Sequence, residues 1–198
     1  MILAPVVTRT WFDRPSVELA PELLGSRLVH DAPDGRVGGR IVEVEAYSGP
    51  EDLAAHSSRG RTARNAVMFG PPGHLYVYLI YGLHHCMNVV AGPDDKPEAV
   101  LIRALEIDEG LALARARRGP RAPQGRLAAG PGNVGQALGV DRSHNGIDLL
   151  AGPVRIKRRS GSLPSMRTGP RVGVAYAGDW AARPMRYWIA DDPNVSRR

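Results

Sequence analysis

Two glutamates and a tyrosine stand at alternating positions in the stretch IVEVEAY, residues 41–47. In a β-strand, successive side chains point to opposite faces, so Glu43, Glu45 and Tyr47 share one face and the valines between them share the other. A carboxylate held in this way can accept a proton or stabilise a developing cation. The same alternation is typical of a half-exposed sheet whose glutamates face water, and by itself it leaves both interpretations open.

A basic segment follows this strand in SGPEDLAAHSSRGRTARN, residues 48–65. It delivers His56 and the arginines Arg59, Arg61 and Arg64 shortly after the two carboxylates. Acid, imidazole and guanidinium groups are thus gathered in one short part of the chain. This weakens the interpretation in which the glutamates merely face water.

Tyrosines are concentrated in the segment HLYVYLIYGLHHCMNVV, residues 74–90. Tyr76 and Tyr78 fall on one face of a predicted strand, whereas Tyr81 and Gly82 fall at the turn of a predicted hairpin. In a basic protein, an aromatic side chain at a hairpin tip can insert between base pairs, and tyrosines on the adjoining strand can stack on a base. Tyrosine is equally common where it packs at a sheet edge, so residue type alone does not decide between these uses.

Charge is distributed unevenly along this chain, whose net charge is +6. Residues 1–110 carry 10 Lys or Arg and 15 Asp or Glu, whereas residues 111–198 carry 16 and 5. Nearly all the cations are arginines, whose planar guanidinium binds phosphate oxygens in a bidentate manner. The basic half indicates nucleic acid or a nucleotide as partner, and the alternative is a merely solvated face. We expect the arginines between residues 115 and 171 to contact phosphates without reading sequence.

Length and composition favour one globular domain over residues 1–198. No run approaches the roughly 18 consecutive apolar residues of a membrane helix, and the N-terminal MILAPVVTRTWFDRP lacks the pattern of a signal peptide. The single cysteine, Cys86, cannot form an internal disulfide. We therefore expect an untargeted cytoplasmic protein.

Several common catalytic motifs are missing or incomplete in the sequence. Neither a G-x-S-x-G elbow nor a P-loop occurs, which removes the commonest hydrolase and NTPase classes. Residues 130–135, GPGNVG, fit a dinucleotide-binding pattern, but no credible strand precedes them, and a helix whose free amides could hold a phosphate is the simpler interpretation. His84, His85 and Cys86 are neighbours on a predicted strand and alternate between its faces, so we expect no metal site.

Turn and periodicity signals predict an α+β fold. Strands that cluster rather than alternate with helices favour a mixed, mostly antiparallel, curved β-sheet with a projecting β-hairpin and a few short helices. Strands are predicted at residues 27–30, 39–47, 75–80, 85–91, 99–105, 154–158, 171–176 and 185–190. Helices are predicted at residues 16–24, 108–118 and 131–138, and loops at 91–98, 119–130 and 159–169.

Several unrelated motifs occur in one order along the chain. The succession is GRIVEVEAYSGPEDLAAHSSRGRTARNAVMFGPPGHLYVYLIYGLHHCMNVV, then AVLIRALE, then GPGNVGQALG, then GPRVGVAYAGDWAARPMRYWI. Between about residue 16 and residue 190, the chain thereby resembles the alkyladenine (3-methyladenine) DNA glycosylase family of base-excision repair.

The resemblance implies excision of alkylated or deaminated purines, such as 3-methyladenine, hypoxanthine or ethenoadenine, by hydrolysis of the N-glycosidic bond. The partner would be double-stranded DNA that contains a damaged purine, and the damaged nucleotide would be flipped out of the duplex. No metal or organic cofactor is expected. Since no lysine lies near these motifs to form a Schiff base, we expect a monofunctional glycosylase without lyase activity. We also expect a monomer that is associated with the nucleoid.

Catalytic roles carry over by resemblance to two residues. Glu45 matches the general base that activates water, and Arg103, in LIRALE, matches the arginine that helps to hold this water. An anionic Glu45 would also stabilise the oxocarbenium-like sugar, and Arg103 would favour the ionised carboxylate. Glu43 is left as a bystander on the same face. Tyr81 matches the hairpin-tip residue that enters the minor groove and fills the space left by the flipped nucleotide.

The base pocket also carries over by resemblance. Tyr47 and His56 match residues on one side of the extruded base, and Tyr78 matches the aromatic residue that stacks on the other side. Asn88, in CMN, matches the asparagine whose side chain leaves no room for the exocyclic amino group of guanine. Leu101 corresponds to a hydrophobic residue near the pocket floor.

Two alternatives from other functional classes fit the same residues. A non-catalytic protein that binds damaged DNA or RNA would use the same basic surface and would release no base. An enzyme that acts on free nucleotides or nucleosides would turn over small substrates and would need no duplex.

Overall fold

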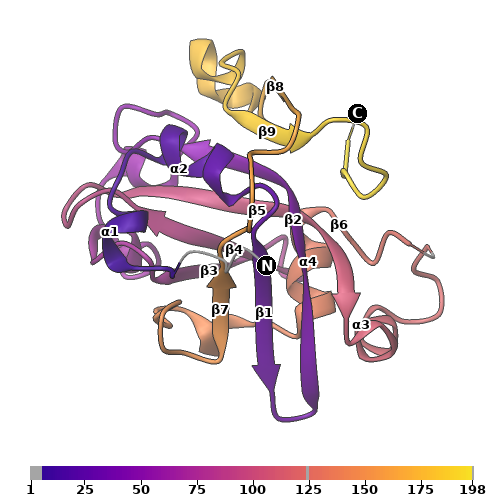
Figure 1. Cartoon of the computed structure of the whole chain (residues 1–198). Helices are drawn as coiled ribbons and strands as arrows, with labels where there is room; N and C mark the ends of the chain where they lie inside the picture. The colour runs from indigo at the N-terminus through magenta and orange to yellow at the C-terminus, as the bar shows by residue number, and fades with distance from the viewer. Residues whose placement is uncertain (1–5, 124, 198) are drawn as a thin grey trace.

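Nine strands form one sheet in the computed structural model, which describes residues 6–123 and 125–197 (Figure 1). The central strands lie in the order β3-β4-β5-β2-β1-β7, while β9 pairs with β2, β8 with β9, and β6 with β5. Their bounds are β1 Arg27–Ala32, β2 Gly35–Tyr47, β3 Leu75–Ile80, β4 His84–Ala91, β5 Glu98–Glu109, β6 Ala128–Ala129, β7 Val154–Lys157, β8 Met166–Gly169 and β9 Arg186–Ile189. All the described pairings are antiparallel. The predicted α+β, single-domain fold is therefore confirmed; of the predicted domain, residues 1–5, 124 and 198 lie outside the described range.

Four short α-helices accompany the sheet. They are α1 Arg9–Phe12, α2 Ser16–Leu23, α3 Leu111–Arg118 and α4 Pro131–Leu138. Leu19 and Leu23 of α2 and Leu138 of α4 share one buried core with Val42 and Val44 of β2. The valine face of the IVEVEAY strand thus contributes to the main core, as the alternation predicts. None of the described helices has the length and apolar character that a membrane crossing requires.

A β-bulge interrupts the long antiparallel pair of β2 and β5. Val44 lies opposite Ile102, whereas Glu43 lies opposite Ala104, so the register shifts by one residue and Arg103 has no Cα partner on β2. Bulges of this kind bend a strand and re-aim a side chain, and they are frequent next to active sites. Here the bulge turns the Arg103 guanidinium toward both carboxylates of the IVEVEAY strand.

Two predicted segments are wrong. Residues 171–176 form no strand: a positive φ angle at Gly173 breaks the extended backbone, and Ala175 already begins the 3₁₀ turns of Ala175–Ala181. The residues of β8 lie in the predicted loop 159–169 and pair with β9.

Other differences concern the ends of elements. β5 continues to Glu109 because it pairs with the long β2, so α3 begins at Leu111 instead of Asp108. Tertiary pairing here overrides local helix propensity. β6 lies within the predicted loop 119–130, of which residue 124 is outside the described range. The four-residue helix α1 was not predicted.

Two hairpins extend from the sheet. The β1–β2 hairpin reaches farthest from the body of the molecule in the view of Figure 1. The β3–β4 hairpin, predicted to carry an exposed aromatic tip, turns at Tyr81 and Gly82, whose φ angles are 53° and 67°. Positive φ at both central residues matches the right-handed twist of the flanking strands. The turn leaves Tyr81 85% exposed and Leu83 77% exposed.

Candidate active site

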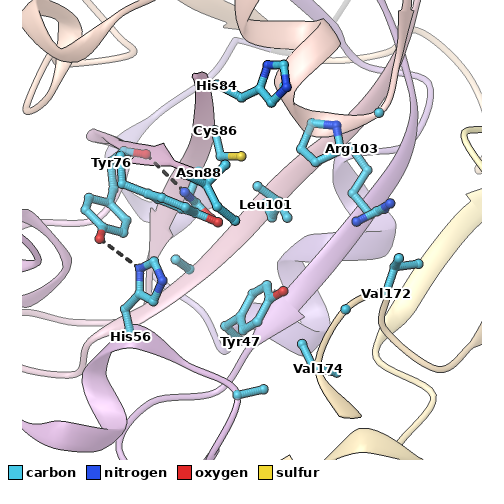
Figure 2. Close-up of a pocket in the computed structure, with 18 of the residues that line it drawn as sticks. Tyr47, His56, Tyr76, His84, Cys86, Asn88, Leu101, Arg103, Val172 and Val174 are labelled. Atoms are coloured by element: carbon cyan, nitrogen blue, oxygen red, sulfur yellow. Dashed lines mark hydrogen bonds between the residues drawn. The ribbon is translucent and has the colours of Figure 1, made fainter. Parts of the chain in front are cut away.

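A cavity of about 490 Å³ lies between the β3–β4 hairpin, the end of β2, the N-terminus of α4 and the segment after β8 (Figure 2). Its lining includes all five residues predicted for the base pocket, namely Tyr47, His56, Tyr78, Asn88 and Leu101. Arg103 and Tyr81 line it too. Residues from five separate parts of the sequence thus meet at one concave site, which is the usual form of a small-molecule or base-binding pocket.

Aromatic rings build one wall of this cavity. The His56 ring lies edge-on to Tyr78, with centroids 4.5 Å apart, and its Nδ1 is 2.9 Å from the Tyr76 hydroxyl (Figure 2). His56 stands at the exposed mouth of the cavity, but the surrounding protein and the nearby Arg64 guanidinium lower its pKa. The imidazole is therefore neutral near pH 7, and it can both donate and accept a hydrogen bond.

The floor of the cavity is formed by two strands. Asn88 of β4 lies directly opposite Leu101 of β5, and their side chains are 4% and 3% exposed. The Asn88 amide nitrogen donates to the backbone oxygen of Tyr76 at 3.1 Å, which fixes the orientation of the amide. The floor is therefore rigid and has one oriented polar group.

Glu45 is fully buried and contacts three residues that line the cavity, Tyr47, Arg103 and Val172. Figure 2 shows these three lining residues. Glu45 Oε1 accepts from the Val172 backbone N–H at 2.7 Å and lies 3.3 Å from Arg103 Nη1. Its Oε2 accepts from the Tyr47 hydroxyl at 3.0 Å. The carboxylate thus has donors on both oxygens and a cation beside it.

Burial raises the pKa of Glu45 above its ordinary value, although Arg103, the Val172 N–H and the Tyr47 hydroxyl act in the opposite direction. Burial, reinforced by the Glu45 charge, raises the pKa of Tyr47 well above its ordinary value. Tyr47 therefore stays a phenol that donates to Glu45. A carboxylate with a raised pKa is a stronger proton acceptor than an exposed one once it is ionised.

A buried ion pair holds the segment that supplies Val172. Arg171 Nη2 donates to Asp52 at 2.8 Å, both side chains are fully buried, and Arg171 Nη1 donates to the Ala46 backbone oxygen at 2.9 Å. The Arg171 guanidinium also lies 4.7 Å from the centre of the Tyr47 ring. Sequence reasoning missed these roles because it placed Arg171 in a strand; GPRVGV, inside the span of the resemblance, was the available signal.

Glu43, which the resemblance left as a bystander, contacts the same arginine as Glu45. Arg103 Nε donates to Glu43 at 2.9 Å, so the guanidinium lies between both glutamates of the IVEVEAY strand. Glu43 is fully buried and also accepts from Arg186 of β9 at 3.0 Å.

The arginines near the cavity differ in their ion pairing from those farther along the chain. Among the described residues, Arg59, Arg61 and Arg64 are exposed and have no carboxylate within ion-pairing distance. By contrast, five arginines between residues 115 and 171 form ion pairs with carboxylates: Arg117, Arg155, Arg159, Arg167 and Arg171. Arg171 is fully buried and is therefore not available for phosphates, whereas phosphate contact stays a prediction for the other arginines between residues 115 and 171.

Metal-binding clusters are absent from residues 6–123 and 125–197, where no group of three or more His, Cys, Asp or Glu side chains could hold an ion. Cys86 is buried at the cavity wall, and burial raises the pKa of its thiol.

Comparison with known proteins defines the class of enzyme. The model of the methylpurine-DNA glycosylase (MPG) family matches residues 10–193, and the chain belongs to this family of DNA-repair glycosylases, which initiate base-excision repair. This confirms the resemblance found in the motifs.

Relatives with similar sequences extend over nearly the whole chain. One from Streptomyces avermitilis is 50% identical and covers 99% of this chain and 94% of its own length. One from Methanocella arvoryzae is 45% identical and covers 98% and 97%, and one from Leifsonia xyli subsp. xyli is 48% identical and covers 95% and 90%. Each of the three bears the name "Putative 3-methyladenine DNA glycosylase".

Proposed function

We propose that this protein is a monofunctional DNA glycosylase that flips alkylated or deaminated purines out of duplex DNA and hydrolyses their N-glycosidic bond. Its substrates would be lesions of the 3-methyladenine, hypoxanthine and ethenoadenine type. Family membership supports the reaction class. The observation that carries the mechanism is the buried Glu45 carboxylate, held by Arg103, Tyr47 and Val172 directly behind a cavity of purine-accommodating size.

Base flipping is part of the proposal because the glycosidic bond of a stacked base is out of reach. Extrusion costs a few kcal/mol, and it costs less for a damaged base. The cavity volume of about 490 Å³ falls within the range of about 300–1,000 Å³ that is common for small-molecule sites. The flipped purine would stack between Tyr47 on one side and Tyr78 on the other. His56, which the resemblance assigned to the Tyr47 side, packs against Tyr78 with ring centroids 4.5 Å apart, so it would contact the base from the Tyr78 side.

The chemical step would use Glu45 as general base. An ionised carboxylate offers about four acceptor positions, and the donors from Tyr47, Val172 and Arg103 occupy three. One position is left for water. As the C1′–N bond breaks, its electron pair leaves with the purine, the water oxygen bonds to C1′, and Glu45 accepts the water proton. Arg103 would orient the water and keep Glu45 ionised.

Selectivity would depend on the pocket floor. Asn88 would exclude guanine, as the resemblance implies, because its side chain would leave no room for an exocyclic amino group. The hydrogen bond from the Asn88 amide to the Tyr76 backbone oxygen supports this role, since it fixes the orientation of the amide. Leu101 beside it would supply an apolar contact for the base.

Contacts with the duplex would come from two exposed features. Tyr81, at the tip of the β3–β4 hairpin, would enter the minor groove and fill the space left by the flipped nucleotide. Arg59, Arg61 and Arg64 would contact phosphates beside the site.

Absence of lyase activity is also proposed. The two lysines of the chain, Lys96 and Lys157, lie in the loop before β5 and in β7, and neither lines the described cavity. Neither lysine is therefore placed to form a Schiff base with C1′. We propose that no cofactor is used and that residues 1–198 act as a single glycosylase domain, as a monomer on the DNA of the nucleoid.

The proposal is tested with a duplex oligonucleotide that contains one hypoxanthine or one ethenoadenine, incubated with the protein and then treated with alkali. Release of the base leaves an abasic site, at which alkali cleaves the strand. Cleavage without the alkali step would contradict the monofunctional mechanism. Tight binding with no cleavage across several alkylated and deaminated purines would instead support the alternative, a non-catalytic protein that binds damaged DNA or RNA.

A further inference from the structure

Glu43 is the centre of a buried polar cluster that the mechanism above does not use. Three groups donate to it: Arg103 Nε at 2.9 Å, Arg186 Nη1 at 3.0 Å, and the backbone N–H of Ser196 at 2.6 Å. The Glu43 side chain has no exposed surface. Removing one member of such a cluster is expensive, because the others are left charged or unpaired in a region from which water is excluded.

Ser196 also contacts Arg103 directly. Its Oγ accepts from Arg103 Nη2 at 3.2 Å. Each of the three guanidinium nitrogens therefore has its own partner: Nε lies on Glu43, Nη2 on Ser196, and Nη1 on Glu45. A guanidinium is planar and rigid, so fixing Nε and Nη2 determines where Nη1 points.

The segment that carries Ser196 is itself held in place. Arg126 Nη2 donates to the backbone oxygens of Val195 and Ser196, at 3.0 and 3.3 Å. Arg186 Nη1 donates to the backbone oxygen of Arg197 at 3.0 Å. Figure 1 shows the chain turning back after β9, so that the C-terminus lies near the end of that strand. The position of Ser196 is thus set by contacts from two separate elements.

We propose that Glu43 and Ser196 are positioning residues that aim the Arg103 guanidinium at Glu45, so that residues 192–197 form part of the active site. The inference rests on the proposed glycosylase function, in which Arg103 acts beside Glu45. In this proposal the C-terminal segment contributes to catalysis by positioning Arg103, and not by contacting DNA.

The first test compares Ser196→Ala with wild type under single-turnover conditions on the hypoxanthine duplex. Loss of one hydrogen bond to a charged donor is expected to lower the rate of base release about fivefold to tenfold, with duplex affinity unchanged. Ser162→Ala, an exposed serine in the loop before β8, is the matched control and should behave as wild type. An unchanged rate in Ser196→Ala would overturn the proposal.

A second readout is the acid limb of the pH–rate profile, which reports the ionisation of Glu45. The titratable and charged groups that face Glu45 are Glu43 and Tyr47 of β2, Tyr78 of β3, Cys86 of β4, Arg103 of β5, and Arg171 of the segment after β8. When Arg103 loses its alignment, the nearest cation is withdrawn and the acid limb should move to higher pH in Ser196→Ala.

Glu43→Gln separates positioning from simple charge. Direct removal of a neighbouring negative charge would move the acid limb to lower pH, whereas a misaligned Arg103 would move it to higher pH. We expect the move to higher pH, since an amide cannot accept from all three donors of Glu43. Glu18→Gln, an exposed glutamate of α2, is the control. A shift to lower pH would contradict the positioning role.

A double-mutant cycle completes the test. If Ser196 acts through Arg103, then Ser196→Ala should cause no further loss of rate in an Arg103→Met background. Additive losses in the double variant would overturn the inference. Failure of the wild type itself to release base from any lesion duplex would instead reject the glycosylase function, so the two failures are distinguishable.

Discussion

Arg171 and Asp52 form a fully buried ion pair that ties the segment after β8 to the turn after β2. Val172 follows Arg171 directly, so the ion pair also positions the Val172 backbone nitrogen, which lies 2.7 Å from Glu45 Oε1. The strand that carries Glu45 and a distant part of the chain are thereby linked at the cavity.

Replacement of Asp52 by Asn should therefore affect both stability and activity. The Arg171 charge would stay buried without its partner, which costs about 3–5 kcal/mol in the free energy of unfolding, measured by urea denaturation. Base release should fall as well, because the Val172 N–H loses its position. Asp179→Asn, at an exposed site, is the control. A loss below about 0.5 kcal/mol, as for ordinary surface changes, would show that the pair does not hold this segment.

Glu45→Gln should lower the single-turnover rate of base release by about 10²–10⁴-fold, the range expected when a general base is lost. The amide keeps the shape of the side chain, so duplex affinity, measured by fluorescence anisotropy, should stay within about twofold of wild type. Retained turnover would mean that another group activates the water.

The activity should depend on pH through the same carboxylate. Because burial raises the pKa of Glu45, base release should fall as the pH drops through that raised pKa, and this limb should be missing from the residual activity of Glu45→Gln. A limb at the pH of an ordinary exposed glutamate would contradict the burial of the ionised group.

The contribution of Glu45 to stability should depend on pH in the direction opposite to that of base release. The folded-state pKa of Glu45 lies above the unfolded-state value, so its contribution to stability is fully present below the unfolded pKa and is lost as the pH rises through the folded pKa. The free energy of unfolding of wild type should therefore fall relative to that of Glu45→Gln across this interval. Urea titrations at a series of pH values provide the measurement, and parallel curves for the two proteins would refute the shift.

Tyr81→Ala should weaken capture of the flipped nucleotide. Truncation of this 85% exposed side chain should change the free energy of unfolding by less than about 0.5 kcal/mol. The rate of base release from a duplex should fall about tenfold, the effect of losing a contact of about 1.4 kcal/mol. The rate of base release from a single-stranded substrate should equal that of wild type. Leu111→Ala, exposed at the start of α3, is the control. An equal effect on both substrates would argue against a wedge.

Local patterns in the sequence were sufficient to predict much of the sheet. The alternation in IVEVEAY separates the valine face from the face of Glu43, Glu45 and Tyr47, and the Tyr81-Gly82 pair marks the hairpin turn. Periodicity and turn chemistry are properties of neighbouring residues, so they can be read without knowledge of the fold. The family motifs added the pocket residues, which the fold brings to one cavity.

Only the tertiary structure decided which groups surround the two glutamates. Arg103 reaches both through a bulge in the β2–β5 register, Val172 arrives on a segment that was predicted as a strand, and Ser196 lies 153 residues along the chain from the carboxylate to which it donates. Contacts of this kind depend on how strands pair and where loops return, and no local pattern encodes them. The sequence by itself therefore determined which chemistry the side chains of the strand could perform. The fold determined that Glu45 contacts residues that line the cavity, whereas Glu43 lies in the buried cluster with Arg103, Arg186 and Ser196.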